Sequence, residues 1–180
     1  HPNFINHKSN LAMAIGKDIN GEYIVADMGK MPHLLIAGQT GSGKSVGING
    51  FILSLLYKNA PDTLRMIMVD PKRVELGVYN GIPHLLTPVI NDPEKALNAL
   101  KWCVAEMLRR YDTFQVARAR NLGEFNEKAT RKDKMPHIVI VIDELADLMM
   151  SGNKKEVENT IARIAQMARA VGMHLIVATQ

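Results

Sequence analysis

Residues 38–45 read GQTGSGKS and match the pattern G-x-x-x-x-G-K-[ST] in full. The apolar run HLLIA precedes the match, and apolar residues at helical spacing follow it. A strand, a glycine-rich turn and a helix in this order are the context in which the pattern forms a phosphate-binding loop. A glycine-rich turn that matches by chance is the alternative. The context favours the loop, and therefore a fold in which parallel strands present their carboxyl ends to a ligand.

The residue types in this stretch explain how phosphate groups are held. Gly41 and Gly43 allow the backbone to curl with its N–H groups pointing inward, and the start of the next helix adds positive potential. The Lys44 ammonium reaches the β- and γ-phosphates, and the Ser45 hydroxyl is placed to ligate Mg²⁺. We therefore expect ATP and Mg²⁺ as ligands and Lys44 as a catalytic residue, and we assign nucleotide binding to Gly38, Gln39, Thr40, Gly41, Ser42, Gly43, Lys44, Ser45 and Val46.

Two adjacent acids, Asp143 and Glu144, end the apolar run HIVIVI. Buried carboxylates are costly unless a cation, a proton or a hydrogen-bond donor compensates them. In phosphate-loop folds the aspartate that ends a second buried strand helps to hold Mg²⁺, so we assign Asp143, directly or through water, to a magnesium site beside Ser45. Glu144 is then placed to deprotonate a water for in-line attack on the γ-phosphate. The alternative is that both acids are solvated residues at the start of a helix.

Apolar runs alternate with amphipathic patterns along most of the chain. The runs at residues 33–37, 64–69, 137–142 and 173–179 read as buried strands, and helical patterns separate them. This alternation predicts an α/β fold with a central, mostly parallel sheet flanked by helices. Together with the loop and the two acids, it indicates a P-loop NTPase of the RecA-like, catalytic-glutamate class.

Capping residues set the expected ends of the later helices. Asp92 precedes Pro93, which is a cap followed by proline at the first helical position. The helix that starts there is expected to fade near residues 121–123. A charged turn, RKDKMP, follows, and a further helix is expected to stop at Gly172.

The last residues, HLIVATQ, form a strand-like run with no following helix or turn. In the catalytic-glutamate class a further strand usually lies between the strand that leads into the phosphate loop (residues 33–37, the loop strand) and the strand that ends in the two acids (residues 137–142, the acid strand). The run HLIVATQ is suitable for this place. Thr179 and Gln180 would then emerge beside the γ-phosphate, so Gln180 joins the nucleotide-binding assignment. An ordinary strand end is the alternative. We interpret the abrupt end as that of one part of a longer protein.

The first 31 residues differ from the rest. LAMAI and EYIVA are short strand patterns, and Asn20-Gly21 between them is a strong hairpin signal. We expect residues 1–31 to form a β-hairpin segment and residues 32–180 to form the ATPase core. No apolar run approaches the length of a bilayer span, one cysteine excludes an internal disulfide, and the net charge of +4 permits a polyanionic partner without requiring one.

With these features in place, the chain resembles the motor domain of the FtsK/SpoIIIE family of DNA translocases. The resemblance covers nearly the whole chain and includes MIMVDPKRVEL, YNGIPHLLTPVI, ALKWCVAEMLRRY, IVIVIDELADLMM and ARAVGMHLIVATQ. The family often has methionine where this sequence has Arg73. That difference raises a question about one local contact and none about membership.

The resemblance implies a function that composition and spacing do not. It implies an ATP-driven motor that pumps double-stranded DNA, gripped by its backbone, through a hexameric ring, in chromosome partition at cell division. It also implies a parent chain anchored at the cytoplasmic side of the bacterial inner membrane, with this segment making no membrane contact. A related secretion or conjugation ATPase is the alternative, and a nucleotide-binding switch without turnover is a third reading, against which Glu144 argues.

Several other residues have two readings. Three histidines stand at strand starts: His33, His137 and His174. We interpret them as polar residues that open a strand, and a metal site is the alternative. A basic band after residue 108 is expected to be a solvated face, with DNA contact as the alternative. Trp102, Cys103 and the methionines are expected in the core. The roles of Asp70, Lys72 and Glu75 stay undecided, and a charge-neutralising arginine from an adjacent subunit is expected beyond Gln180, although Arg163 and Arg169 fit chemically.

Overall fold

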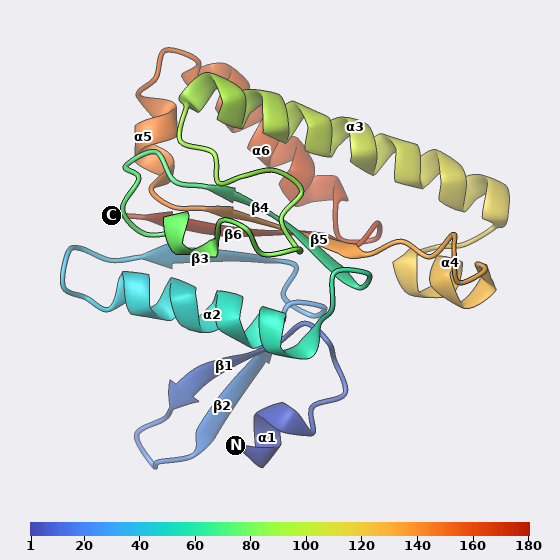
Figure 1. Ribbon diagram of the computed structural model, residues 1–180, viewed down its shortest axis with the longest axis horizontal. Coiled ribbons are helices and arrows are strands. Elements are labelled where there is room, and N and C mark those ends of the chain that lie inside the picture. The colour runs from blue at the N-terminus through green and yellow to red at the C-terminus, as the bar shows by residue number, and fades with distance from the viewer.

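A four-stranded parallel sheet in the order β3-β6-β5-β4 forms the centre of the molecule (Figure 1). The computed structural model describes residues 1–180, and the strands of this sheet are β3 (His33–Ala37), β4 (Leu64–Val69), β5 (His137–Ile142) and β6 (Met173–Thr179). The terminal strand β6 lies between the loop strand β3 and the acid strand β5, so the predicted place of the last strand is confirmed.

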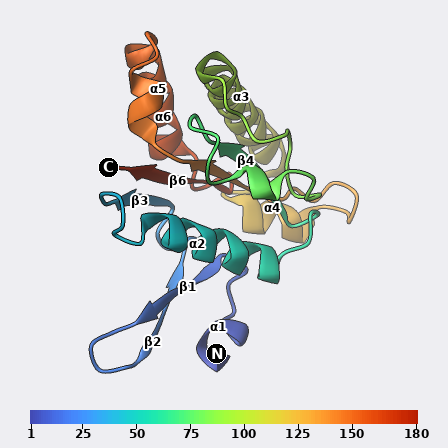
Figure 2. The same ribbon diagram turned by 60° about the vertical axis from the view of Figure 1, so that its left-hand side comes forward.

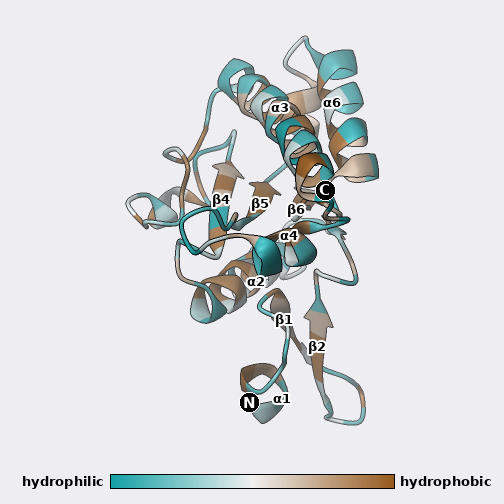
Figure 3. Cartoon of the chain, turned by 90° about the vertical axis from the view of Figure 1, so that its right-hand side faces the viewer, coloured by the Kyte–Doolittle hydropathy of each residue, from teal (hydrophilic) through white to brown (hydrophobic).

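The continuous apolar runs form strands because both faces of the sheet are covered. In β5, Ile138, Ile140 and Ile142 belong to one apolar cluster, whereas Val139 and Val141 belong to another. The alternation follows from the period of two along a strand. Figure 3 shows hydrophobic colour along the strands and hydrophilic colour on the outer turns of the helices. The mostly parallel sheet between two layers, which the sequence predicted, is confirmed.

The helices divide unequally between the two faces (Figure 1). One apolar cluster joins the sheet to α3 (Pro93–Ala117), α4 (Leu122–Lys128), α5 (Leu145–Met149) and α6 (Lys154–Met167). The other joins the sheet to α2 (Lys44–Lys58) and to the N-terminal hairpin. None of the helices combines the length and the hydropathy that crossing a bilayer requires.

The start of α3 agrees with the prediction and its end does not. The Asp92 side chain accepts a hydrogen bond from the Glu94 backbone N–H, and Pro93 follows at the first helical position. The helix ends at Ala117, because Arg118 adopts a left-handed conformation with φ of 55°. A separate helix, α4, then begins after Asn121, whose side chain accepts from the Glu124 N–H. The expectation of one helix that fades near residues 121–123 is therefore wrong.

The N-terminal strands β1 (Ala12–Lys17) and β2 (Tyr23–Asp27) form an antiparallel hairpin, as the sequence predicted. A short helix, α1 (Pro2–Ile5), precedes them. The hairpin projects from the side of the molecule that carries α2 (Figure 2). It is fixed to α2 by a hydrogen bond from the Ala14 N–H to the Ser54 hydroxyl, 3.1 Å, and by buried Met13 and Met28. The division of the chain at residues 31 and 32 remains a prediction.

Residues 84–90 cover the outer edge of β4. The Met66 N–H donates to the His84 carbonyl at 2.8 Å, and the Ile90 N–H donates to the Met68 carbonyl at 2.9 Å. Parallel bridges join Met66 to Leu85 and Val69 to Ile90. A short 3₁₀ helix, η1 (Gly77–Tyr79), lies between β4 and this segment. The edge strand is therefore protected by an irregular partner from the same chain.

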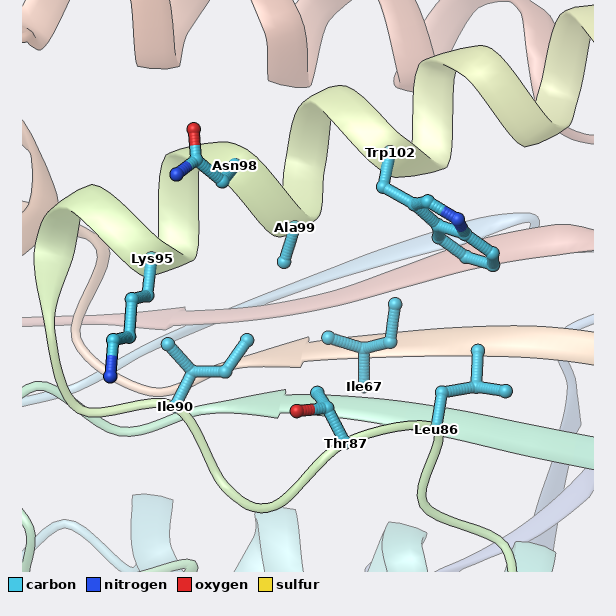
Figure 4. A pocket seen from close by; sticks show the side chains of 8 residues that line it. All are labelled: Ile67, Leu86, Thr87, Ile90, Lys95, Asn98, Ala99 and Trp102. Carbon is cyan, nitrogen blue, oxygen red and sulfur yellow. The ribbon is translucent and has the colours of Figure 1, made fainter.

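Trp102 and part of the methionines are not in the core. Trp102 is 45% exposed and lines a hollow of about 500 Å³ between α3 and the segment that covers β4 (Figure 4), together with Ile67, Leu86, Thr87, Ile90, Lys95, Asn98 and Ala99. Met150 is exposed, whereas Met13, Met66 and Met107 are buried. Cys103 is buried as expected, and burial raises the pKa of its thiol to about 12. The expectation was wrong for Trp102, because the helical period places it beside Cys103 but not inward.

Candidate active site

The loop between β3 and α2 has the backbone geometry that its sequence predicts. Gly41 and Gly43 have φ values of 83° and 90°, in the left-handed region that favours glycine. Gly38 is required for a different reason, since a Cβ atom there would lie 2.4 Å from the Ser42 hydroxyl oxygen. α2 begins at Lys44 without a side-chain cap, so its first backbone N–H groups are available to an anion.

A hollow of about 420 Å³ lies over this loop and is mostly polar. The residues that line it come from the loop, from the segment after β4 and from the ends of β5 and β6: Gln39, Thr40, Gly41, Gly43, Lys44, Ser45, Val46, Lys72, Val74, Glu75, Asp143, Glu144 and Gln180. Most of the residues assigned from the sequence therefore come together. Gly38 and Ser42 do not line the hollow, and the Ser42 side chain occupies the space that a Cβ atom at Gly38 would need.

Lys44 and Glu144 form a buried ion pair across the hollow. The Lys44 ammonium donates to a Glu144 carboxylate oxygen at 3.2 Å, and their side chains are 11% and 6% exposed. The other Glu144 oxygen lies 3.4 Å from the Thr179 hydroxyl and from the Gln180 N–H. Glu144 has a φ of 61°, a strained conformation for a residue with a side chain. The fold therefore holds this carboxylate at the end of β5 in spite of a backbone cost.

The Ser45 hydroxyl has a partner that the sequence did not indicate. It donates to a Glu75 carboxylate oxygen at 2.8 Å, and no hydrogen bond joins it to Asp143. Glu75 belongs to the loop after β4, whose role the sequence left undecided. Lys72 from the same loop also lines the hollow and lies 3.9 Å from an Asp147 oxygen. The one available signal was that this loop also leaves the carboxyl edge of a parallel sheet.

Asp143 is buried, lines the hollow and has other acids nearby. Burial, and then the nearby charge of Asp70, raises the pKa of the Asp143 carboxyl to about 6, although Lys44 acts in the opposite direction. Glu75 and Glu144 add smaller effects of the same sign as Asp70. Such a concentration of carboxylates favours a cation at this position.

The donor set fits Mg²⁺. Hydroxyl and carboxylate oxygens are hard ligands, and Mg²⁺ usually takes one or two of them from the protein and the rest from phosphate and water. Ser45 and Asp143 both line the hollow. No group of three or more His, Cys, Asp or Glu side chains is arranged to hold a metal by itself. A magnesium ion at Ser45 and Asp143 would therefore share its coordination with a nucleotide.

The three histidines of the strand starts gather at the opposite edge of the sheet, as the strand order implies. The His33 Nδ1 accepts from the Leu175 N–H at 3.1 Å, and the His174 Nδ1 donates to the Pro32 carbonyl at 3.0 Å. Burial, followed by the influence of His137, lowers the pKa of His174 to about 3. Burial also lowers the pKa of His33 and of His137. The imidazoles are thus neutral, and those of His33 and His174 bond to backbone groups, whereas His33 Nε2, His137 Nδ1 and His174 Nε2 are buried without a hydrogen-bond partner.

The basic band contains one residue that is not on a solvated face. Arg110 is 2% exposed, and its guanidinium donates to the carbonyls of Pro136 and Val171, both at 2.8 Å, and to Glu106 at 3.0 Å. Arg109 and Arg120 are paired with glutamates of their own helices or caps. The expectation of a solvated face is therefore wrong for Arg110, which joins α3 to the amino edge of the sheet.

Known proteins resemble the chain both in sequence and in structure. The DNA translocase FtsK of Campylobacter jejuni is 60% identical over 179 residues, which cover 98% of this chain and 19% of that protein. The FtsK protein of Clostridium acetobutylicum is 59% identical over 180 residues, covering 98% and 23%. The chain thus spans about a fifth of the length of these relatives.

Two solved structures have the same fold. The pCW3 conjugation coupling protein TcpA, in its monomer form with ATPγS, superposes with a TM-score of 0.80 at 29% identity and covers 97% of this chain and 49% of that one. The cytoplasmic domain of the type VII secretion ATPase EccC from Thermomonospora curvata gives a TM-score of 0.81 at 27% identity and covers 97% and 22%. A model of the FtsK/SpoIIIE family matches residues 1–180. The chain therefore belongs to the FtsK/SpoIIIE family and has the fold of its P-loop ATPases.

Proposed function

We propose that the chain is the ATP-hydrolysing part of a motor that moves double-stranded DNA. The observation that carries the proposal is the Lys44–Glu144 pair, which joins the phosphate loop to the acid strand at the floor of one polar hollow. The relatives whose sequences match nearly all of this chain are DNA translocases by name. In a motor of this kind, ATP hydrolysis is coupled to movement of parts of the protein. The hollow is lined by the phosphate loop, the segment after β4 and the ends of β5 and β6, so a change in the nucleotide can act on several elements.

The residues of the hollow take successive roles as the nucleotide enters. The β- and γ-phosphates compete with Glu144 for the Lys44 ammonium, because a phosphate group carries more charge than one carboxylate. The Glu144 carboxylate is thereby released to accept a proton from the attacking water. Gln180 and Thr179 lie beside that carboxylate and help to hold it in place. Mg²⁺, held by Ser45 and with the help of Asp143, supplies neutralisation of phosphate charge when it is bound.

The wider setting is also part of the proposal. We place the motor in a ring, taken to be a hexamer, on the cytoplasmic side of the bacterial inner membrane, where it serves chromosome partition at cell division. The bacterial sources of the relatives and their length beyond this chain support that setting. DNA contact is sequence-independent and directed to the phosphates, since a motor must move over any sequence.

A second candidate is a conjugation or secretion ATPase. The similarity to TcpA and EccC, at 29% and 27% identity, favours it specifically. The higher identity to DNA translocases, 60% and 59%, favours the DNA motor. The two candidates differ in whether naked duplex DNA engages the ATPase.

The test is ATP turnover by the full-length protein that contains this chain, with and without duplex DNA of unrelated sequences. We expect every duplex to raise turnover, and we expect added salt to reduce that increase steeply. The Lys44→Ala variant reports the background rate. A protein pump would show the same turnover with and without DNA, and this result would replace the DNA motor with the second candidate.

A further inference from the structure

The partner of the Ser45 hydroxyl indicates a further functional residue. The hydroxyl has one proton and two oxygen lone pairs. Its proton is donated to Glu75 at 2.8 Å, which leaves the lone pairs directed away from Glu75. Glu75 lines the same hollow as the phosphate loop, although 30 residues separate it from Ser45 in the chain.

Hydrogen bonds to Asp70 hold the loop that carries Glu75. Asp70 is fully buried, and one of its carboxylate oxygens accepts from the Glu75 N–H at 2.9 Å and from the Leu76 N–H at 3.0 Å. The Asn91 amide donates to the Asp70 carbonyl at 2.8 Å. Arg73, within the turn, has a φ of 59°, a strained conformation that these bonds maintain. Hydrogen bonds within the fold therefore set the backbone position of Glu75.

We propose that Glu75 is a positioning residue for the divalent cation: it accepts the Ser45 hydroxyl proton and so aims the hydroxyl oxygen at Mg²⁺. The inference rests on the proposed nucleotide site. A carboxylate is a stronger acceptor for this purpose than a neutral group, because the hydrogen bond is charge-assisted. Groups that orient a metal ligand in this way typically contribute about 10–100-fold to metal affinity.

The structure also defines the opposite possibility. Glu75 could hold Ser45 only in the absence of nucleotide and compete with the cation for the hydroxyl. Removal of Glu75 would then strengthen the effect of Mg²⁺ on nucleotide binding, whereas removal of a positioning residue weakens it. The two roles therefore differ in the sign of one measurement.

The experiment measures the affinity of the full-length protein that contains this chain for a fluorescent ATP analogue, once in Mg²⁺ and once in EDTA. Mn²⁺ uptake in the presence of the nucleotide, followed by electron paramagnetic resonance, gives a second readout that does not depend on turnover. In Glu75→Ala we expect the gain in affinity produced by Mg²⁺ over EDTA to fall roughly tenfold or more. Glu127→Ala, an exposed acid on α4, is the matched control and should equal the wild type.

A double variant tests whether Glu75 acts through the hydroxyl. In the Ser45→Ala background, Glu75→Ala should cause no further loss, because the group that it positions is gone. Glu75→Gln keeps the side-chain shape and one neutral acceptor, so it should show a smaller loss of the same kind and serves if the alanine variant is unstable. An unchanged or larger Mg²⁺ gain in the Glu75 variants overturns the proposal. Failure of the wild type to bind nucleotide in either buffer would instead overturn the nucleotide site itself.

Discussion

Burial shifts the pKa values of titratable groups in opposite directions at the two edges of the central sheet. At the carboxyl edge, burial and neighbouring acids raise the pKa of Asp143 to about 6. At the amino edge, burial and a neighbouring imidazole lower the pKa of His174 to about 3. In each case desolvation favours the neutral form. The two edges differ in the neighbours of the buried group, which are mainly carboxylates around Asp143 and imidazoles around His174.

The carboxyl edge holds a strained residue and an excess of carboxylates, whereas the histidines of the amino edge are neutral. Glu144 has a left-handed backbone, and the Asp143 carboxylate lies near three others, those of Asp70, Glu75 and Glu144, with Lys44 as the opposing cation. The imidazoles of His33 and His174 are neutral and bond to backbone groups of adjacent strands. The neutral imidazoles need no counter-ion, whereas the excess negative charge at the carboxyl edge fits the proposed nucleotide and cation. The comparison separates the part of the sheet that is proposed to bind nucleotide from the part that joins neighbouring strands.

The largest effect is expected from Lys44→Ala. ATP affinity should fall by on the order of a hundredfold or more, since two contacts to charged phosphates of roughly 1.5–3 kcal/mol each are lost. Turnover should disappear with it. Isothermal titration calorimetry measures the affinity, with Lys155→Ala, an exposed lysine of α6, as the control. Wild-type affinity in Lys44→Ala would show that the loop is not the phosphate site.

Glu144→Gln should separate binding from hydrolysis at the same edge. The amide has the same shape but cannot accept the proton of the attacking water, so hydrolysis should slow by about a hundredfold or more. ATP should remain bound. Single-turnover measurements on the full-length protein give the rate of the chemical step. If that rate is unchanged, the base is a different residue.

Gly172→Ala should damage the amino edge and leave the site intact. Gly172 has a φ of 76°, and a Cβ atom there would lie 2.2 Å from a Leu122 methyl carbon. The handedness costs about 1–2 kcal/mol and the overlap adds a similar amount. Urea denaturation measures the loss, and nucleotide affinity should not change.

Gly152→Ala is the matched control for this change. Gly152 has a φ of 94°, and no atom lies within 4 Å of the Cβ position. It should therefore show the cost of handedness alone. Equal losses in the two variants would mean that the overlap at Gly172 is relieved by movement of Leu122.

At neutral pH the smallest effect is expected from His174→Gln, which keeps a donor for the Pro32 carbonyl but does not titrate. The pKa of His174 is 6.5 in the ordinary case and about 3 in the folded chain. Below pH 6.5 the unfolded chain binds a proton that the folded chain does not, so stability is lost as the pH falls from about 6.5 to about 3. The slope is up to about 1.4 kcal/mol per pH unit for this group. In His174→Gln that slope should decrease.

The lowered pKa values of His33 and His137 keep part of the slope in this variant. Denaturation at several pH values between 4 and 7 measures it, and His1→Gln, at the exposed N-terminus, serves as the control. An unchanged slope would show that protonation of His174 does not oppose folding, and the contrast between the edges would lose its electrostatic basis.

Local periods and spacings predicted the parallel sheet and most residues of the hollow, and the usual arrangement of the fold class predicted the place of β6 between β3 and β5. The short helices α1, α4 and α5 have too few turns to show a helical period. Arg110 was misplaced because the guanidinium is satisfied by carbonyls 26 and 61 residues away. The contacts of Ser45 with Glu75 and of Lys44 with Glu144 likewise join residues 30 and 100 positions apart. Spacing along the chain carries no information about such pairs.

Because residues 84–90 cover the edge of β4, a further strand can pair with this sheet only at its other edge. One side is closed by the chain itself, while β3, at the other end of the strand order, pairs only with β6. The outward N–H and C=O groups of β3 are thus the only row in this sheet that can accept another strand. Any additional strand, from the same polypeptide or from a neighbour, would extend the sheet beside the strand that leads directly into the phosphate loop.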